Sequence, residues 1–421
     1  MVDYKISTKP YSDSPRDQLK RLGRDTLSGF SFYYYNLHWF LGPYFLFLPF
    51  ILPFWDIFLG RTVPLLRQTA ILAVVLHTLF FIGITAGYHR LWTHRSYEAV
   101  KPLRYLLIVL SCGIPQFDII WWARHHRSHH RYVDTDKDPY NVKKGLFWVH
   151  LGWLITLNDK HWGPVDVSDI EDDPVAQWQR RNYYPLMVVV SIIIPPLICY
   201  FGWHDFSGGL KYAVAWRLLI GHHATFLVNS LAHWSGQQPF TTGVSARDNL
   251  LLGIFSAGEG HHNFHHRFPS DYRNGLRLPD FDLSKLFIQL CAKLGLAKNL
   301  VQTSEREIEQ ARMLAQGITP KSYEDVNEAT VLSVLSWSDY EHLTRTGSCL
   351  VSISGRVCDI TDFMHSHPGG PATLQDAIGT DVTDLFNEID HSPYALSLLS
   401  SLQMAVLDPK SDQSQSSKKD E

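Results

Sequence analysis

Two copies of the pattern HxxHH are the strongest chemical signal in this chain. They lie in WWARHHRSHH at residues 121–130 and in GEGHHNFHH at residues 258–266, and their histidines are His126, His129, His130, His262, His265 and His266. Positions i, i+3 and i+4 lie on one side of a helix, so each copy is expected to present three imidazoles toward a common point. Because histidine is the commonest metal ligand in proteins, such clusters predict metal binding.

Two further pairs of side chains are candidates for the same site. His89 and His94 occur in YHRLWTHR, and Asn229 and His233 have the i, i+4 spacing of one helix face. Two residues five apart do not share one face of an α-helix, so His89 or His94 is expected where its helix ends. Three histidines have no partner motif and are expected to pack or hydrogen bond inside the protein: His77, His222 and His223.

The elements that must position these side chains are expected to be embedded in a membrane. A helix needs about 20 apolar residues to cross a hydrocarbon core of about 30 Å. The run Ser31–Trp55 contains no Lys, Arg, Asp or Glu. Three more runs are expected to span: Gln68–Tyr88, Asn182–Trp203 and Leu218–Trp234. The run Tyr105–Phe117 has 13 residues, which favours a helix that lies on the membrane.

Four spans arranged as two hairpins would place all the histidine clusters on one side of the membrane. The N-terminus, the Tyr88–Arg181 loop and everything after Trp234 then share that side. Basic residues are frequent before the first span, namely Lys5, Lys9, Arg16, Lys20, Arg21 and Arg24, whereas the first turn carries Arg61 and Arg67. This excess of positive charge predicts that the shared side is cytosolic.

Composition and charge exclude several other classes of protein. A chain of 421 residues suggests two domains rather than one. The formal net charge of -3 provides no electrostatic attraction to nucleic acid, so we exclude that partner. The five cysteines form no CxxC pair, so neither a disulfide framework nor a cysteine zinc site is indicated. The polar segment at residues 1–30 lacks the apolar core of a cleaved signal peptide.

The region at residues 330–408 is expected to form a second, smaller domain. Short strands are indicated around the Ser-Gly turn of VSISGRVCDI, and His367 in HPGG is followed 24 residues later by His391. In these features the region resembles cytochrome b5, and the resemblance implies that His367 and His391 are the axial ligands of a haem b. Two histidines on one haem leave no open coordination position, which favours electron transfer over oxygen binding.

The order HRLWTH, HRSHH, NSLAH and HHNFHH, with DPYNVKKGLFWVHLGW and QRRNYY between them, resembles the membrane-integral acyl-CoA Δ9, or stearoyl-CoA, desaturases. With an electron carrier fused at the C-terminus, the resemblance is to the fungal members. Carried over by position, it implies that two irons are ligated by His89, His94, His126, His129, His130, His233, His262, His265 and His266. Asn229 would contribute through a water. His125 and His261 stand where animal members have an acidic and an aromatic residue, which leaves their roles open.

The resemblance also implies a reaction and its partners. The two irons would use O2 to introduce a cis double bond into saturated palmitoyl- or stearoyl-CoA, with electrons from NADH through cytochrome b5 reductase and the haem domain. The metal supplies the chemistry and the fold supplies alignment. The CoA head would be bound by basic side chains of the cytosolic face, with Arg124, Lys143, Lys144, Arg180 and Arg181 as candidates.

The choice of metal depends on both halves of the chain. Imidazole ligands suit zinc, copper, iron and nickel, so the histidines alone do not name the metal. Zinc has no redox chemistry, and a fused electron carrier therefore favours iron. Fusion makes electron delivery a tethered encounter, with an effective concentration set by the linker at residues 299–329.

We therefore expect an α-helical integral membrane protein followed by a small α+β cytochrome b5-like domain. Four transmembrane helices would carry a cytosolic helical cap with a His-rich di-metal site. The expected segments are a polar cytosolic segment (1–30), the desaturase domain (31–298), a linker (299–329), the haem domain (330–408) and a polar tail (409–421).

The C-terminal residues predict a location for the protein, and the histidine clusters are compatible with two alternative functions. Lys418 and Lys419 stand at the positions of a dilysine retrieval signal, which favours the endoplasmic reticulum membrane with both termini cytosolic. A histidine-box hydroxylase would use the same irons but insert oxygen into its product. A zinc-dependent membrane hydrolase with an unrelated haem module is the second alternative.

Overall fold

The chain divides into two compact units in the computed structural model. The described residues are 45, 51–156, 162–277, 280–318, 333–364, 367, 371–388, 399 and 402–408. The first unit comprises Met1–Arg267 and Asp271–Gln302, and the second comprises Phe268–Ser270 and Thr303–Glu421. Each unit buries a hydrophobic core of its own.

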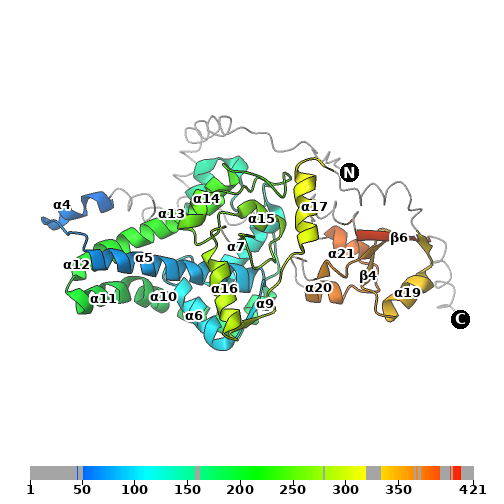
Figure 1. The fold of residues 1–421 in the computed structure, drawn as a ribbon, viewed down its shortest axis with the longest axis horizontal. Coiled ribbons are helices and arrows are strands. Elements are labelled where there is room, and N and C mark those ends of the chain that lie inside the picture. The colour runs from blue at the N-terminus through cyan, green and yellow to red at the C-terminus, as the bar shows by residue number, and fades with distance from the viewer. Residues whose placement is uncertain are drawn as a thin grey trace. The chain divides into compact units, whose positions relative to one another are not determined.

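The first unit is helical. Its described helical segments are η1 (Leu52–Phe54), α4 (Trp55–Leu59), α5 (Arg67–Ile82), η2 (Gly83–Thr93), α6 (Lys101–Ser111), α7 (Ile119–Tyr132), η3 (Val142–Lys144), η4 (Trp148–Gly152), α8 (Trp153–Ile155), α9 (Ser168–Glu171), α10 (Pro174–Met187), η6 (Val188–Ile193), α11 (Ile194–Trp203), α12 (Phe206–Gly208), η7 (Gly209–Trp216), α13 (Arg217–Ser230), η8 (Leu231–His233), α14 (Leu250–Phe255), α15 (His262–Arg267) and α16 (Leu283–Lys293). In Figure 1, α5, α11 and α13 run side by side, and α7 and α15 lie toward one end of them. The two HxxHH copies are therefore carried by helices at the same end of the long bundle.

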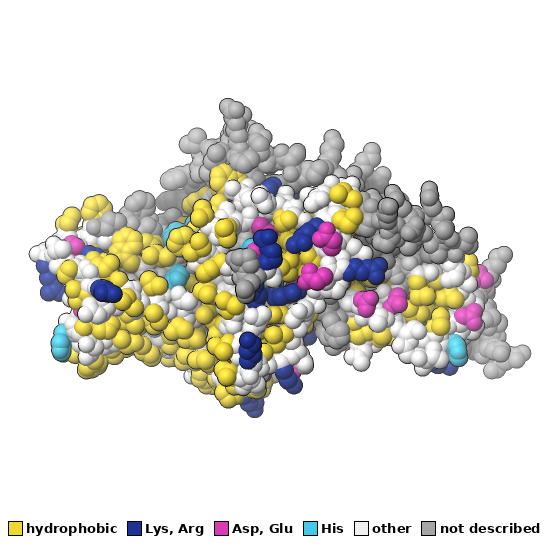
Figure 2. Space-filling view, in the orientation of Figure 1, with side chains coloured by type: hydrophobic (Ala, Val, Ile, Leu, Met, Phe, Trp, Pro, Cys, Tyr) yellow, Lys and Arg dark blue, Asp and Glu magenta, His cyan; other side chains and the backbone are white. Residues whose placement is uncertain are grey.

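Among the described residues, two stretches of this unit are long and apolar enough to cross a membrane: Arg67–Thr93 and Pro174–Trp203. They contain the predicted runs Gln68–Tyr88 and Asn182–Trp203. Their outer side chains are exposed, as Val74 (66%) and Phe201 (76%) illustrate, and Figure 2 shows hydrophobic side chains over much of this unit. Such a surface suits contact with lipid rather than water.

The predicted number of four spans stays a prediction. Ser31–Trp55 lies mostly outside the described residues. The Leu218–Trp234 run falls in α13 and η8, which directly follow η7. Helix α6 covers much of the predicted Tyr105–Phe117 stretch and has 11 residues. At about 1.5 Å per residue it is too short to cross the hydrocarbon core, which agrees with the expectation of a helix that does not span.

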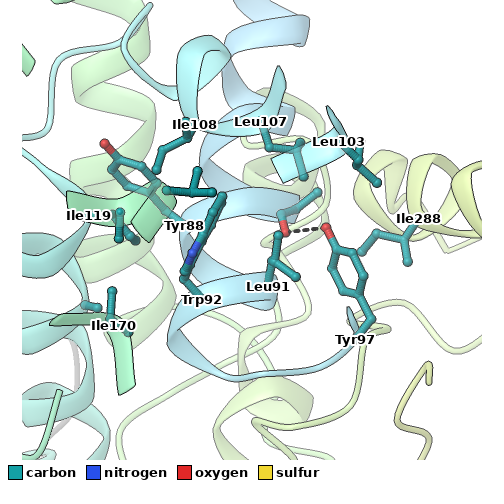
Figure 3. Close-up of a cluster of buried hydrophobic side chains, with 14 of the residues drawn as sticks. Tyr88, Leu91, Trp92, Tyr97, Leu103, Leu107, Ile108, Ile119, Ile170 and Ile288 are labelled. Carbon is teal, nitrogen blue, oxygen red and sulfur yellow. Dashed lines mark hydrogen bonds between the residues drawn. The ribbon is translucent and has the colours of Figure 1, made fainter. Parts of the chain in front are cut away.

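Helices η2 and α6 pack closely in the core of the first unit. Figure 3 shows Tyr88 of η2 beside Ile108 of α6, in one buried cluster with Trp92, Leu103 and Leu107. A Cβ atom at Gly83 would lie 2.5 Å from the backbone nitrogen of Ser111. Because no other residue lacks a Cβ, glycine is needed for this approach.

A short ribbon fixes the end of η2 against the end of the first unit. Strand β1 (Glu98–Ala99) pairs antiparallel with β2 (Ala297–Lys298). Beside it, the Tyr97 hydroxyl donates a hydrogen bond to the Ala86 carbonyl at 2.8 Å, drawn as a dashed line in Figure 3.

The second unit contains a four-stranded sheet with order β3-β6-β5-β4. Its described elements are α17 (Glu305–Ala315), β3 (Ser333–Leu335), α19 (Trp337–Arg345), β4 (Leu350–Ile353), β5 (Arg356–Asp359), α20 (Pro371–Gln375), α21 (Thr383–Glu388) and β6 (Gln403–Leu407). Strand β3 is parallel to β6, and the other pairs are antiparallel. The predicted Ser-Gly turn joins β4 to β5, with φ of 52° at Ser354 and 73° at Gly355, as a two-residue hairpin turn requires.

Candidate metal centre

Two groups of imidazoles converge in the interior of the first unit. The five-histidine group consists of His89, His94, His126, His130 and His265. The four-histidine group consists of His129, His233, His262 and His266. Within each group the potential ligand atoms lie within 4.8 Å of one another. All nine histidines that the resemblance assigned to the two irons therefore fall in one or other of these groups.

Nε2 nitrogens face one another in the five-histidine group. The Nε2 atoms of His89 and His265 are 2.9 Å apart, and Nε2 of His265 is 3.0 Å from that of His130. Nε2 of His126 lies 3.1 Å from Nε2 of both His94 and His130. Hydrogen bonds between the rings would use these nitrogens pairwise, whereas a cation between them would accept all their lone pairs.

The four-histidine group has the same design and adjoins the first. Nε2 of His262 lies 3.0 Å from Nε2 of His233 and 3.1 Å from that of His266, and Nε2 of His129 lies 3.3 Å from that of His266. The rings of His266 and His130, one from each group, stack with centroids 4.3 Å apart. The two groups could thus hold two metals side by side.

The expectation that each HxxHH copy points to one common site is wrong. In α7 the i and i+4 residues, His126 and His130, join the five-histidine group, whereas the i+3 residue, His129, joins the other. Helix α15 does the reverse. Since successive residues turn by about 100° around an α-helix, positions i+3 and i+4 point in clearly different directions. Each helix therefore contributes to both groups.

A π-helical segment brings His89 and His94 together. Residues Gly83–Thr93 form a π-helix, and His94 follows its last residue. The backbone N–H of His94 donates to the carbonyl of His89 at 3.0 Å, and the two rings are 4.8 Å apart. The expectation that one of them lies at a helix end is therefore confirmed. The expectation that they cannot share one side is wrong, because the wider π turn aligns residues five apart.

The end of the α13 helix positions the last ligand candidate. His233 is buried in η8, and Asn229 is half-buried in the last turn of α13. The contribution of Asn229 through a water stays a prediction.

Burial prepares these imidazoles for metal binding. Burial lowers the pKa of His126, His130, His265 and His266 well below the usual value, and it lowers the pKa of His262 to about 3. The rings are therefore neutral at physiological pH, which is the form that binds metal. A donor set of neutral nitrogens with inward lone pairs fits iron, and also the other metals that imidazole favours.

Several buried polar residues around the groups were not anticipated from the sequence. The Nδ1–H of His89 donates to Glu259 at 3.0 Å, and that of His129 donates to Asp138 at 2.9 Å. Burial alone would raise the pKa of Glu259, but His89 and Arg90 outweigh it and bring the pKa to about 2. Glu259 is therefore a carboxylate. Both carboxylates lie in quoted motifs: Glu259 in GEGHHNFHH, and Asp138 as the first residue of DPYNVKKGLFWVHLGW.

Asn263, inside the second copy, anchors helix α15. Its amide accepts hydrogen bonds from the backbone N–H groups of Phe240 and Thr241, and it donates to the carbonyls of Thr241 and Ala246. Asp248 accepts a hydrogen bond from the backbone N–H of Asn263 at 2.8 Å. These bonds explain why a polar residue stands between the ligand candidates His262 and His265.

Neither His125 nor His261 belongs to a histidine group. The His125 ring lies tilted against Trp121 with centroids 3.8 Å apart, and its Nδ1 lies 2.6 Å from the Trp121 carbonyl. Burial lowers its pKa to about 3. His261 is half-buried and forms an isolated bridge to Asp248. The structure therefore separates both residues from the nine ligand candidates.

The basic residues singled out for CoA are exposed or half-buried. Arg124 is exposed and donates to Glu171 at 2.8 Å, and Lys144 lies over the Trp148 ring. Lys143, Arg180 and Arg181 are exposed. Their role in CoA binding stays a prediction.

The described part of the haem domain contains one of the two predicted axial ligands. His367 is half-buried, and its ring lies 5.7 Å from that of Phe363. His391 lies outside the described residues.

Comparisons with known proteins cover both units. Residues 65–297 match the family "Fatty acid desaturase", and residues 336–408 match "Cytochrome b5-like Heme/Steroid binding domain". A probable acyl-CoA desaturase of Schizosaccharomyces pombe is 43% identical over 86% of this chain and 76% of its own length. Acyl-CoA desaturase 1 of Saccharomyces cerevisiae is 38% identical over 84% of this chain and 71% of its own. Stearoyl-CoA desaturase 2 of Rattus norvegicus is 36% identical over 57% of this chain and 68% of its own.

Proposed function

The chain belongs to the fatty acid desaturase family and carries a C-terminal cytochrome b5 domain, and on this premise we propose that it introduces a cis Δ9 double bond into saturated fatty acyl-CoA. Membership makes it an acyl-CoA desaturase, an oxidoreductase. The observation that supports the proposal best is the pair of adjoining, buried imidazole groups, since two metals side by side are suited to O2 chemistry on an unactivated chain.

Positioning is the main task of the protein side chains in this reaction. The nine histidines of the two groups would hold two irons, which would supply O2 activation and removal of two hydrogens from adjacent methylenes. O2, two electrons, two protons and the two removed hydrogens together give two waters. Aromatic side chains around the groups, such as the half-buried Trp122 stacked on His126 with ring centroids 4.8 Å apart, would shield the centre from bulk water.

Electrons would come from the haem domain of the same chain. The cytochrome b5 domain indicates haem, and His367 with His391 would ligate it. The donor upstream would be an NADH-cytochrome b5 reductase. A haem with both axial positions filled passes on electrons one at a time and leaves O2 to the histidine groups.

The membrane would supply the substrate. The two apolar stretches Arg67–Thr93 and Pro174–Trp203 support an integral membrane protein, and the proposed location is the endoplasmic reticulum with both termini cytosolic. The exposed Arg124 and Lys143 are candidates for contact with the CoA phosphates.

Expression in cells that lack their own Δ9 desaturase tests the proposal. Growth without added unsaturated fatty acid is expected, and mass spectrometry should find palmitoleic and oleic acyl chains with a cis bond at carbon 9. Metal analysis of the purified protein should find two irons per chain. A hydroxylated product, a bond at another position, or zinc without iron in active protein would overturn the corresponding part of the proposal.

A further inference from the structure

The ligand rings of the two histidine groups have an outward as well as an inward nitrogen. Where Nε2 faces the centre, Nδ1 points away and needs a partner that fixes the tautomer. His89 donates from Nδ1 to Glu259, and His129 donates to Asp138. Nδ1 of His233 lies 2.7 Å from the Ser245 hydroxyl, which donates to Asp134 at 2.5 Å. One ring in each group is thus bound directly to a carboxylate.

Glu259 is itself held on both oxygens. Its Oε1 accepts from Arg90 at 3.0 Å, and its Oε2 accepts from His89 at 3.0 Å and from Asn274 at 2.9 Å. Arg90 is also paired with Asp282 at 3.0 Å, and its side chain is 1% exposed. Every contact of Glu259 here is with a donor, so an amide at this position would set one of its own N–H groups against another N–H.

Asp138 is held in a similar way on the other side of the centre. Its Oδ1 accepts from His129 and from the backbone N–H of Tyr140, both at 2.9 Å. Its Oδ2 accepts from the backbone N–H of Asp134 at 3.0 Å. The Asp138 side chain is 1% exposed. Both carboxylates are therefore rigid and shielded from water before any metal binds.

Glu259 and Asp138 also supply negative charge close to the two metal sites. Nine neutral imidazoles bring no negative charge to two divalent metals, and the buried site cannot rely on water to compensate for the positive charge. A carboxylate that accepts the Nδ1 proton makes the ring a stronger ligand and places negative charge close to the metal. Glu259 contacts a ring of the five-histidine group, and Asp138 contacts a ring of the four-histidine group.

We propose that Glu259 and Asp138 are positioning residues for different metals: Glu259 sets the tautomer and charge of the five-histidine site through His89, and Asp138 does the same for the four-histidine site through His129. This inference rests on the proposed function, because it takes the two groups as the sites of two irons.

Iron retention by the full-length protein tests the inference. Wild type, Glu259→Gln and Asp138→Asn are purified in one detergent, loaded anaerobically with 57Fe2+ and dialysed against a graded chelator. Replacement of such a carboxylate typically weakens metal binding by about 10–100-fold. Each variant is therefore expected to release one of its two irons at a lower chelator concentration. Mössbauer spectra should show that the two variants weaken different iron sites.

Double variants assign each carboxylate to its group. His94→Ala removes a ligand of the five-histidine group, so adding Glu259→Gln should cause little further iron loss. His266→Ala removes a ligand of the other group, so its combination with Glu259→Gln should lose both irons. The converse is expected for Asp138→Asn. Glu259→Asp retains the negative charge and should recover part of the affinity, which a purely space-filling role does not predict.

A matched control separates local effects from loss of folding. Asp173 is buried, and it is hydrogen bonded to Trp92, Arg104 and the Val175 backbone N–H rather than to a histidine of either group, so Asp173→Asn should retain two irons. Wild-type iron affinity in both Glu259→Gln and Asp138→Asn, or loss of the same iron from both, would overturn the inference. Wild type that binds no iron would instead contradict the proposed function.

Discussion

At the scale of single residues, the structure separates histidines that are adjacent in the sequence. His125 precedes His126 directly, yet its ring lies against Trp121 while the ring of His126 faces the five-histidine group. The difference follows from helix geometry, since neighbouring residues of α7 point about 100° apart.

This separation leads to a prediction for single substitutions. Alanine in place of any ligand of the two HxxHH copies, such as His129 or His265, should reduce desaturation to background, because a centre that activates O2 tolerates no lost ligand. His125→Ala and His261→Ala should be far milder. Fatty acid analysis after expression in a desaturase-deficient strain measures the effect, with membrane insertion and haem absorbance unchanged. Full activity in His129→Ala or His265→Ala would contradict the assignment of these histidines as metal ligands.

The spacing of the histidines was enough to predict the ligands but not what holds them. HxxHH is recognisable because helical periodicity links sequence to space. Glu259 and Asp138 act on His89 and His129 through the tertiary fold, and a single carboxylate has no periodic pattern to reveal it. Asn263 was visible inside HHNFHH, but its buried bonds to the Phe240 and Thr241 backbone depend on a loop whose path the sequence did not predict.

At the scale of elements, the main difference between expectation and structure is the π-helix that carries His89. An α-helix was the default expectation, and the five-residue spacing to His94 was interpreted as a helix end. His94 lies at a helix end and still shares a side with His89. The reason is that the π turn closes an i to i+5 hydrogen bond immediately before the chain leaves the helix. Unusual ligand spacing was therefore the available signal for a π turn.

The packing of this segment on α6 gives an element-scale prediction. In Gly83→Ala the new Cβ would be 2.5 Å from the Ser111 backbone nitrogen, so the η2 and α6 helices must separate. Overpacking of this kind costs about 1–3 kcal/mol of unfolding free energy. Gly202→Ala in α11 is the control, because nothing lies within 4 Å of its new Cβ. Thermal unfolding in one detergent should show a lower midpoint for Gly83→Ala alone.

At the scale of the whole molecule, the sequence predicted two domains, one with a histidine-rich metal site and one with a haem, and the structure contains two compact units. The hairpin of β4 and β5 was predictable because Ser-Gly between alternating residues is a local turn signal. The membrane arrangement was harder to predict, since polar groups such as His222, His223 and Asn229 lower the apolar character of α13. The burial of His222 and the partial burial of His223 and Asn229 depend on tertiary packing rather than on composition.

The division into two units predicts that haem loss and membrane-domain folding are independent. His367→Ala or His391→Ala should remove haem absorbance but leave the iron content and thermal unfolding of the first unit unchanged, because each unit buries its own core. Desaturation by purified protein with NADH and reductase should then collapse. Free cytochrome b5 in excess should restore part of it, since a diffusing donor replaces a tethered one only by mass action. Normal activity of the haem-free variant without added cytochrome b5 would show that electrons reach the histidine groups by another route.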